Sequence, residues 1–351
     1  MPAEPHRSAA LRLRDALEAQ SAGVPLAALA ASVDRLIGRY RAGGAAQAPI
    51  LAFDVDVLAY ALYRMPATFA ACRNLLQHSA FRLGPITSVV DLGGGTGAAA
   101  WAVAQEWPDA TVTVLDQVEA ALRLGEQLRA GEPGRVDFRR WQAGDPVPAA
   151  DLVTVSYVLS ELTPADQLGV ARAAMGAARR AVVLVEPGTP DGYARIMAVR
   201  DELRSAGWQL VAPCPHQLDC PLAAPDWCHF GARVERSAIH RRLKGGELGH
   251  EDEKFAYVAA LAPDAGGATE VAAEEAGEAE KSGKAEESGE AEESGEAGEA
   301  RILRHPVKRK GLVELQLCRP DGTAGRSVVT KRRGGDYKQA RDARWGDAWP
   351  V

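Results

Sequence analysis

The stretch V-V-D-L-G-G-G-T-G-A, residues 89–98, decides the fold class. A short apolar run comes first, then five residues of which four are glycine, and then A-A-A-W-A-V-A-Q-E-W with helical composition up to Pro108. A strand that passes through a glycine-rich turn into a helix aims unpaired backbone N–H groups at a nucleotide-type ligand. The sequence therefore predicts a ligand-binding α/β unit that begins near residue 86.

Further apolar segments of strand length follow this unit, with helical stretches between most of them. They are T-V-T-V-L-D, V-D-F-R-R-W, D-L-V-T-V-S-Y-V-L, A-V-V-L-V-E-P and W-Q-L-V-A-P. Alternation of strands and helices predicts a parallel, doubly wound sheet. Before the sheet, L-R-L-R-D-A-L-E-A-Q and V-D-R-L-I-G-R-Y have helical spacing, and Pro66 is expected to open a further helix that contains Cys72 as a buried thiol.

The glycine loop fits two ligand patterns. Gly93, Gly95 and Ala98 match the dinucleotide pattern G-x-G-x-x-A. Gly93, Gly95 and Gly97, preceded by Asp91, give D-x-G-x-G-x-G, which resembles motif I of class I S-adenosylmethionine methyltransferases. The acid favours S-adenosylmethionine, whose ammonium a dinucleotide lacks, while an unliganded structural turn is the third interpretation.

Three residues further along complete the predicted cofactor site. Asp116 ends the next strand, where a carboxylate can accept hydrogen bonds from both ribose hydroxyls. Asp145 follows the third strand and is a candidate for the adenine, although a solvated loop aspartate is an equal alternative. Ser156 lies near the end of the fourth strand, which faces the cleft in doubly wound sheets.

No catalytic group can be assigned from the sequence. N-P-P-Y and D-P-P-Y are absent at the end of the fourth strand, and no cysteine lies at the end of the fourth or fifth strand. Methylation of base amino groups, or of pyrimidine carbons through a cysteine nucleophile, therefore lacks its usual residues.

Three of the five cysteines fall within A-P-C-P-H-Q-L-D-C-P-L-A-A-P-D-W-C-H-F, residues 212–230. The candidate metal ligands are these three and one distant thiol: Cys214, Cys220, Cys228 and Cys318. The paired C-x2-C motifs typical of zinc sites are missing, but a zinc site with three cysteines and His216 or His229 is an alternative. Iron–sulfur clusters take four thiolates. Spacing alone leaves a cluster, zinc and structural thiols open.

Charge is unevenly distributed along the chain. Residues 264–300 hold 13 acidic and 2 basic side chains in an imperfect six-residue repeat, which predicts a disordered linker. Residues 301–351 hold 13 Lys and Arg and 5 Asp and Glu. A basic terminal block suggests a polyanionic partner.

No apolar run is long enough for a membrane span, and no signal-peptide pattern starts the chain. Arg12 and Arg14 hint at a transit peptide, but the acids Glu4, Asp15 and Glu18 argue against it. We expect a cytoplasmic protein of bacterial type, with a mitochondrial location as the weaker alternative.

Several long stretches resemble a known family in the same order. They are Y-R-M-P-A-T-F-A-A, V-V-D-L-G-G-G-T-G-A-A-A-W-A, L-V-E-P-G-T-P-D-G-Y, A-P-C-P-H with W-C-H-F, E-D-E-K-F-A-Y-V and Y-K-Q-A-R-D-A-R-W-G-D. Together the chain resembles the methyltransferase-like mitochondrial small-ribosomal-subunit assembly factors and their bacterial relatives.

The resemblance implies a seven-stranded class I methyltransferase-like sheet, S-adenosylmethionine at the glycine loop and a [4Fe–4S] cluster carried over to the four candidate cysteines. It implies a partner, the small ribosomal subunit or its rRNA, and we expect a monomer without membrane contact. Two basic segments would then lie together if one cluster held all four thiolates: Arg233, Arg236, Arg241, Arg242 and Lys244, and Lys308, Arg309, Lys310, Lys331, Arg332 and Arg333.

The expected organisation has five parts. They are an N-terminal helical region (1–84), the S-adenosylmethionine-binding core (85–210), a cysteine-rich metal-binding segment (211–263), the acidic linker (264–300) and a basic C-terminal segment that completes the metal site (301–351). Three functions stay open: an assembly factor that binds S-adenosylmethionine without using it, an active rRNA methyltransferase, and a small-molecule methyltransferase with structural zinc. The basic terminus disfavours the third.

Overall fold

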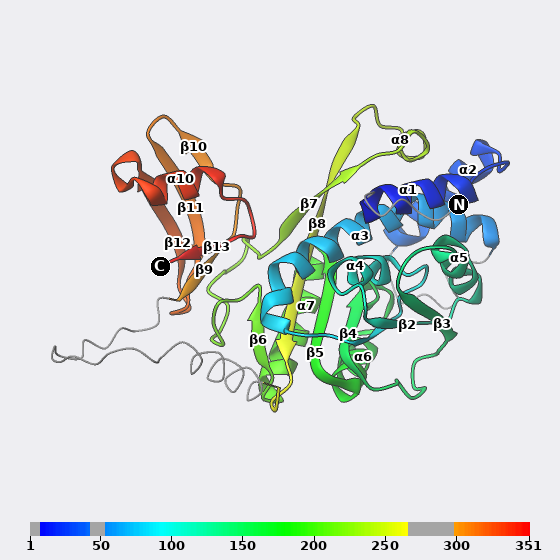
Figure 1. Ribbon diagram of the computed structural model, residues 1–351, viewed down its shortest axis with the longest axis horizontal. Coiled ribbons are helices and arrows are strands. Elements are labelled where there is room, and N and C mark those ends of the chain that lie inside the picture. The colour runs from blue at the N-terminus through cyan, green and yellow to red at the C-terminus, as the bar shows by residue number, and fades with distance from the viewer. Residues whose placement is uncertain (1–7, 43–52, 266–297) are drawn as a thin grey trace, which may run out of the picture.

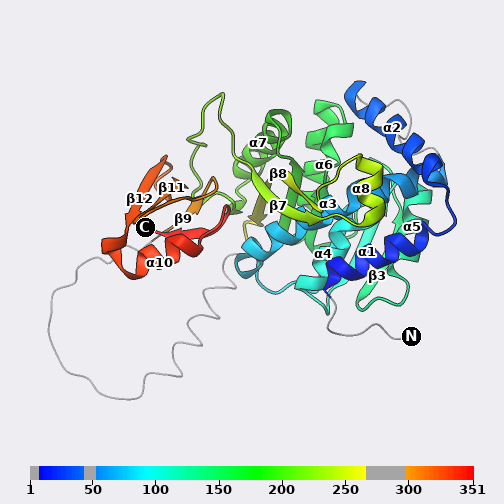
Figure 2. The ribbon, with the colours of Figure 1, turned by 90° about the horizontal axis from the view of Figure 1, so that it is seen from above.

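The computed structural model describes residues 8–42, 53–265 and 298–351. Figures 1 and 2 show a large α/β part and, beside it, a small sheet formed by the C-terminal residues. Most of the predicted acidic linker lies outside the described residues, but its last two residues, Glu299 and Ala300, already belong to strand β9. No helix in the described ranges is long and apolar enough to cross a bilayer.

The large sheet has the strand order β3-β2-β1-β4-β5-β8-β6, and β7 pairs with β8. The first five strands of this path are mutually parallel, whereas β8 runs antiparallel to β5, β6 and β7. Its strands are β1 (Ser88–Leu92), β2 (Thr111–Asp116), β3 (Arg135–Arg140), β4 (Ala150–Ser156), β5 (Ala178–Pro187), β6 (Gln209–Ala212), β7 (Phe230–Glu235) and β8 (His250–Leu261). The predicted doubly wound, mostly parallel sheet is confirmed, with β7 added to the seven-stranded path.

The large sheet continues beyond residue 210, where the expected core ends. β8 comes from the predicted cysteine-rich segment, yet it lies between β5 and β6 in the large sheet. Its apolar half, F-A-Y-V-A-A-L, is buried throughout. The chain therefore leaves the sheet after β6, forms the cysteine loop and β7, and returns to complete the core.

Both faces of the sheet are buried, because alternate side chains of one strand join different apolar clusters. On β1, Val89 belongs to the cluster under α3, α4 and α5, while Val90 belongs to the cluster under α6 and α7. The helices are α1 (Ala9–Gln20), α2 (Leu26–Ala42), α3 (Asp54–Leu83), α4 (Ala98–Glu106), α5 (Glu119–Arg129), α6 (Pro164–Ala177), α7 (Pro190–Ser205) and α8 (Ala238–Lys244), with the 3₁₀ turn η1 (Leu159–Glu161). The N-terminal helical part is thus present, and α3 packs directly against β8.

The expectation that Pro66 opens a helix is wrong, because Pro66 lies inside the 30-residue helix α3. A proline inside a helix removes one backbone donor and costs about 3 kcal/mol. Seventeen residues of α3 are buried, and this packing outweighs the local penalty. Cys72, also on α3, is buried as predicted.

The C-terminal residues form a five-stranded antiparallel sheet in the order β10-β11-β9-β13, with β12 paired to β11. The elements are β9 (Glu299–Ile302), β10 (Val307–Arg309), β11 (Leu312–Cys318), β12 (Ala324–Thr330), η2 (Lys331–Arg333), α10 (Gly335–Asp342) and β13 (Ala348–Pro350). Alternate residues of β11, Val313, Leu315 and Leu317, enter a separate apolar cluster that includes Trp349. The predicted terminal segment therefore has a core of its own.

One buried arginine joins this small sheet to the cysteine loop. Arg301 on β9 is 3% exposed, and its Nη1 donates to the carbonyl oxygen of Gly346 over 2.7 Å. Its Nε donates to the carbonyl oxygen of Pro213, next to Cys214, over 3.2 Å. These bonds hold β9, the chain before β13 and the cysteine loop in one arrangement.

Arg301→Met should destabilise the full-length chain by about 1.5–3 kcal/mol, because two buried carbonyls lose a charged donor. The control is Arg326→Met on β12, whose side chain is 61% exposed and pairs with Glu314. Urea denaturation of both variants measures the free energy of unfolding. Equal stability of the two variants would contradict the role given to Arg301.

Candidate functional site

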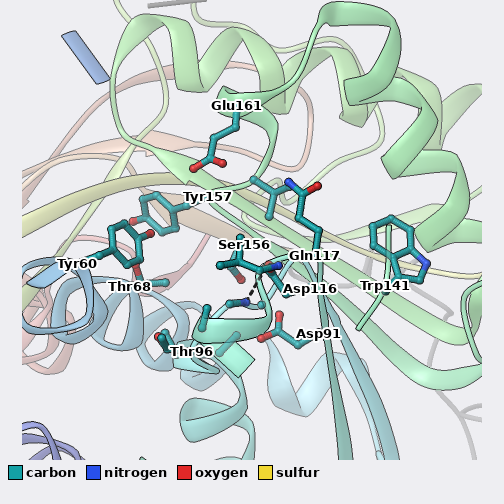
Figure 3. Close-up of a pocket in the computed structure, with 18 of the residues that line it drawn as sticks. Tyr60, Thr68, Asp91, Thr96, Asp116, Gln117, Trp141, Ser156, Tyr157 and Glu161 are labelled. Atoms are coloured by element: carbon teal, nitrogen blue, oxygen red, sulfur yellow. Dashed lines mark hydrogen bonds between the residues drawn. The ribbon is translucent and has the colours of Figure 1, made fainter. Parts of the chain in front are cut away.

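The glycine loop lies at the carboxyl end of the parallel strands and forms one wall of a cavity of about 380 Å³ (Figure 3). The backbone N–H groups of Gly93 and Gly94 both donate to the carbonyl oxygen of Leu115, at 2.7 and 3.1 Å. These bonds tie the loop to the end of β2 and direct the following residues into α4. The cavity is therefore built where doubly wound sheets bind their ligands.

Asp91 lies on the floor of the cavity and is 1% exposed. Its Oδ1 accepts a hydrogen bond from Thr154 Oγ1 over 2.8 Å, whereas its Oδ2 is buried without a partner among the described residues. Burial raises the pKa of Asp91 to about 7, against the opposing effect of the Thr154 hydrogen bond. A buried acceptor without a donor fits a cationic group of a ligand, such as the ammonium of S-adenosylmethionine.

Space beside Asp91 exists because residue 94 is glycine. A Cβ at Gly94 would stand 2.3 Å from Asp91 Oδ2. Gly93 and Gly95 line the cavity as predicted, but Gly97 does not. Gly97 starts α4 with φ of 83°, and a Cβ there would meet the Phe138 ring at 3.1 Å. The third glycine of the motif therefore allows close packing instead of ligand approach.

Asp116 lines the same cavity from the end of β2. Its Oδ2 accepts the N–H of Gly95 over 2.9 Å, and its Oδ1 accepts the N–H of Val118 over 2.8 Å. A carboxylate has about four acceptor positions, so both oxygens can still accept ribose hydroxyls. Burial raises the pKa of Asp116 above its ordinary value, against these two backbone bonds.

Asp145 is exposed and is not among the residues that line the cavity. Its Oδ2 accepts the N–H of Gln142, and its carbonyl oxygen accepts Nε1–H of Trp141 over 3.0 Å. Asp145 therefore closes its own turn and orients Trp141, which does line the cavity. The predicted loop thus borders the cavity through Trp141, while the Asp145 side chain lies outside the lining.

The opposite wall comes from α3 and the end of β4. Ser156 lines the cavity as predicted, and Tyr60, Met65 and Thr68 of α3 were not predicted. Tyr157 has φ of 62°, which is rare for a residue with a side chain. Such strain accumulates where a side chain must be aimed for function.

Tyr157 is held by an ion pair that the sequence did not reveal. Its hydroxyl donates to Glu253 Oε1 over 3.1 Å, and Arg64 Nη2 lies 3.0 Å from the same oxygen. Glu253 is on β8 and Arg64 on α3, so the network joins the elements that enclose the cavity. Figure 3 shows Tyr60 and Tyr157 on one side of the cavity and Trp141 on the other.

Among the described residues that line this cavity, none is a cysteine, histidine or lysine. Cys72 is close, with its Sγ 3.6 Å from Ser156 Oγ, but burial raises its pKa to about 12. It is therefore a neutral thiol at ordinary pH and not a nucleophile. In the same described lining, Glu161 is the one carboxylate besides Asp91 and Asp116.

A second, small cavity of about 30 Å³ brings the four predicted cysteines together. Cys214, Cys220 and Cys228 reach it from the loop between β6 and β7, and Cys318 reaches it from the end of β11. All four sulfurs are free thiols in the structure. Burial is the first cause of the raised pKa of Cys214, Cys228 and Cys318, so thiolates there require a compensating cation.

Within residues 8–42, 53–265 and 298–351, no group of three or more His, Cys, Asp or Glu side chains is placed to hold a metal ion. His216 Nε2 is 3.4 Å from Cys318 Sγ, whereas His229 Nδ1 contacts the carbonyl oxygen of Trp227.

The expected union of the two basic segments is not observed. Figures 1 and 2 both show α8 far from the C-terminal sheet. The first segment is also paired with acids of β8, because Arg236 and Lys244 bind Glu251, and Arg233 binds Asp252. β7 leads the chain away from the cysteine loop, so a shared metal would not join these segments.

The second segment does form one surface, at one end of the C-terminal sheet. Leu312 on β11 pairs with Arg309 on one side and Thr330 on the other. The N–H of Lys331 donates to the carbonyl oxygen of Gly311 over 2.8 Å. We call this surface the basic end; it consists of the exposed residues Lys308, Arg309, Lys310, Lys331, Arg332 and Arg333.

Comparison with known proteins gives matches over most of the chain and matches over parts of it. Residues 54–350 match the family described as mitochondrial small ribosomal subunit Rsm22. Human mitochondrial ribosome assembly protein METTL17 is 29% identical over 320 residues, which cover 84% of this chain and 62% of the human protein. Mouse acetylserotonin O-methyltransferase is 33% identical over 165 residues, 42% of each chain.

Among solved structures, magnesium protoporphyrin IX methyltransferase from Synechocystis PCC 6803 with bound SAH aligns at 14% identity with a TM-score of 0.38. The alignment covers 64% of this chain and 92% of that one. The family match contains the cavity beside the glycine loop, the four cysteines and the basic end, and it takes in most of the chain. The chain belongs to the mitochondrial small ribosomal subunit Rsm22 family.

Proposed function

We propose that this protein is a methyltransferase-like assembly factor of the small ribosomal subunit that binds S-adenosylmethionine and an iron–sulfur cluster. The observation that carries the proposal is the continuous family match over residues 54–350. Its human relative is named a ribosome assembly protein, and the exposed basic end offers cationic side chains to the phosphates of rRNA. The proposed location is the cytoplasm of a bacterial-type cell.

The residues of the large cavity suit S-adenosylmethionine. The unpaired Oδ2 of Asp91 would accept the ammonium, and the free acceptor positions of Asp116 would accept the ribose hydroxyls. Trp141 and Val118 provide apolar surface for the adenine. The cofactor supplies an electrophilic methyl group when bound, whereas this chain binds and orients it.

Methyl transfer to rRNA is the alternative function. Glu161 would be the base, since Figure 3 shows its carboxylate directed into the cavity opposite the glycine loop. The alternative requires an acceptor to reach the space between Glu161 and the two tyrosines, Tyr60 and Tyr157. A small-molecule methyltransferase would not need the basic end to bind its substrate.

The four cysteines suit a [4Fe–4S] cluster in the chemistry of their donors. They are four thiols around one cavity, they come from two segments, and the nearest nitrogen donor contacts only one of them. The cluster would join the loop after β6 to the C-terminal sheet. Zinc held by cysteines and His216 is the alternative metal.

Metal analysis tests the cluster directly. Protein purified without oxygen should contain about four irons and four acid-labile sulfides per chain, with little zinc. Cys318→Ser should lower the iron content, because it removes the only proposed ligand from the C-terminal sheet. Cys72→Ser is the control and should keep the metal. One zinc without sulfide in the wild-type chain would replace the cluster with a zinc site.

Affinity for S-adenosylhomocysteine should rise by up to tenfold per pH unit between about pH 5.5 and about 7, and then level off. The reason is the raised pKa of Asp91, about 7: below it the carboxyl is protonated and presents no charge to the ammonium. Asp91→Asn should weaken binding and flatten this profile. Asp145→Asn is the control and should leave both unchanged; calorimetry at each pH gives the affinities.

Replacing Lys331 and Arg332 with glutamine should weaken binding to rRNA of the small subunit. The slope of log affinity against log salt should fall by about 1 for each phosphate that the variant no longer neutralises. Arg241→Gln with Arg242→Gln on α8 is the matched control for charge. An equal decrease of affinity in both variants would exclude the basic end as the binding surface. Labelled S-adenosylmethionine in the same reactions would reveal any methyl transfer.

A further inference from the structure

One face of α7 lines the cavity of the four cysteines. Tyr193, Ile196, Met197 and Arg200 all line it. Their spacing of three, four and seven residues places them on one side of a helix. Two of the four carry hydrogen-bond donors, so α7 presents polar groups as well as apolar packing to the sulfurs.

Arg200 is the more unusual of these groups. It is 2% exposed, and its Nη2 donates to the carbonyl oxygen of Leu218. Its Nε and Nη1 are buried without any hydrogen-bond partner within the described ranges. The nearest acid is Asp201, 3.6 Å from Nη1 and itself 62% exposed. An arginine is charged at every ordinary pH, and burying a charge without a partner is costly.

Tyr193 supplies the second donor. Its hydroxyl donates to Cys220 Sγ over 3.2 Å. Arg200 lines the same cavity as Cys214 and the other three cysteines. One helix therefore brings a hydroxyl donor to Cys220 and a buried guanidinium to the wall of the cavity that the four cysteines share.

Both donors match the electrostatics of a metal–thiolate centre. Four thiolates on an iron–sulfur cluster leave net negative charge in a buried site, and that charge grows by one when the cluster accepts an electron. Hydrogen bonds to the sulfurs and a nearby cation stabilise the more negative state. The reduction potential should therefore be higher than it would be with apolar side chains at these positions.

We propose that Arg200 and Tyr193 are positioning residues of the cysteine site: Arg200 balances the negative charge of the thiolate-bound cluster, and Tyr193 donates to one of its sulfur ligands. The inference rests on the cluster proposed above. It goes beyond that proposal because it assigns the surrounding groups that set the cluster's charge balance and reduction potential. It also explains why the fold retains a buried guanidinium whose Nε and Nη1 lack acceptors in the described part of the chain.

The test is a redox titration of the full-length, cluster-loaded protein, followed by electron paramagnetic resonance with dithionite as the reductant. Arg200→Met should lower the reduction potential, so that the ratio of reduced to oxidised cluster at a fixed potential falls about tenfold or more. Tenfold corresponds to about 59 mV for one electron. Arg200→Lys should restore part of the shift, and Tyr193→Phe should lower the potential by less.

Arg172→Met is the matched control, because Arg172 lies on α6, is 61% exposed and pairs with Glu202. An Arg200→Met protein that keeps its iron and titrates at the wild-type potential would overturn the inference while leaving the cluster in place. Absence of iron and sulfide from the wild-type chain would overturn both proposals. If Arg200→Met loses its iron, the same titration is made on Arg200→Lys and Tyr193→Phe. Wild-type potentials in both variants would then overturn the inference.

Discussion

The architecture depends on the meeting of the loop after β6 with the end of β11. Cys318 contacts His216 across this junction, and Arg301 donates to the carbonyl oxygen of Pro213 in the same place. Arg304 adds bonds to Asp226 and to the carbonyl oxygen of Trp227. Each contact joins the C-terminal part of the chain to the cysteine loop, so the position of the basic end relative to the large sheet is fixed here. The C-terminal sheet has its own apolar cluster, and this junction orients it against the core.

The cavity beside the glycine loop follows from a different constraint, the closure of a parallel sheet by α3. The loops after β1, β2 and β4 lie together at the carboxyl ends of these strands. The topology of a doubly wound sheet therefore places a ligand site there. The long helix α3 then covers this edge with Tyr60, Met65 and Thr68. The ion pair between Arg64 and Glu253 ties the helix to β8 and holds Tyr157 in its strained conformation.

Local patterns in the sequence were sufficient to predict those elements whose role depends on the shape of the backbone. The strand, glycine turn and helix at residues 88–106 are found as predicted, and so is the apolar alternation that ends at Cys318. The two alternatives for Asp145 could not be separated, because a loop aspartate can bond its own backbone as readily as a ligand, and no spacing distinguishes the two. Arg200, Tyr193 and Glu253 could not be found, since each acts on residues distant in the chain. β8 was missed because half of it is charged and its partners are far away in sequence.

The position of β8 has a consequence for the order in which the protein is made on the ribosome. The large sheet lacks a strand between β5 and β6 until Leu261 has been synthesised, whereas Cys318 is added only later. At about 5–20 residues per second, the complete core precedes the last proposed ligand by roughly 3–11 s. During that interval Cys214, Cys220 and Cys228 lack the C-terminal sheet that carries Cys318. Delivery of iron and sulfide to a nascent chain would then compete with oxidation of these thiols.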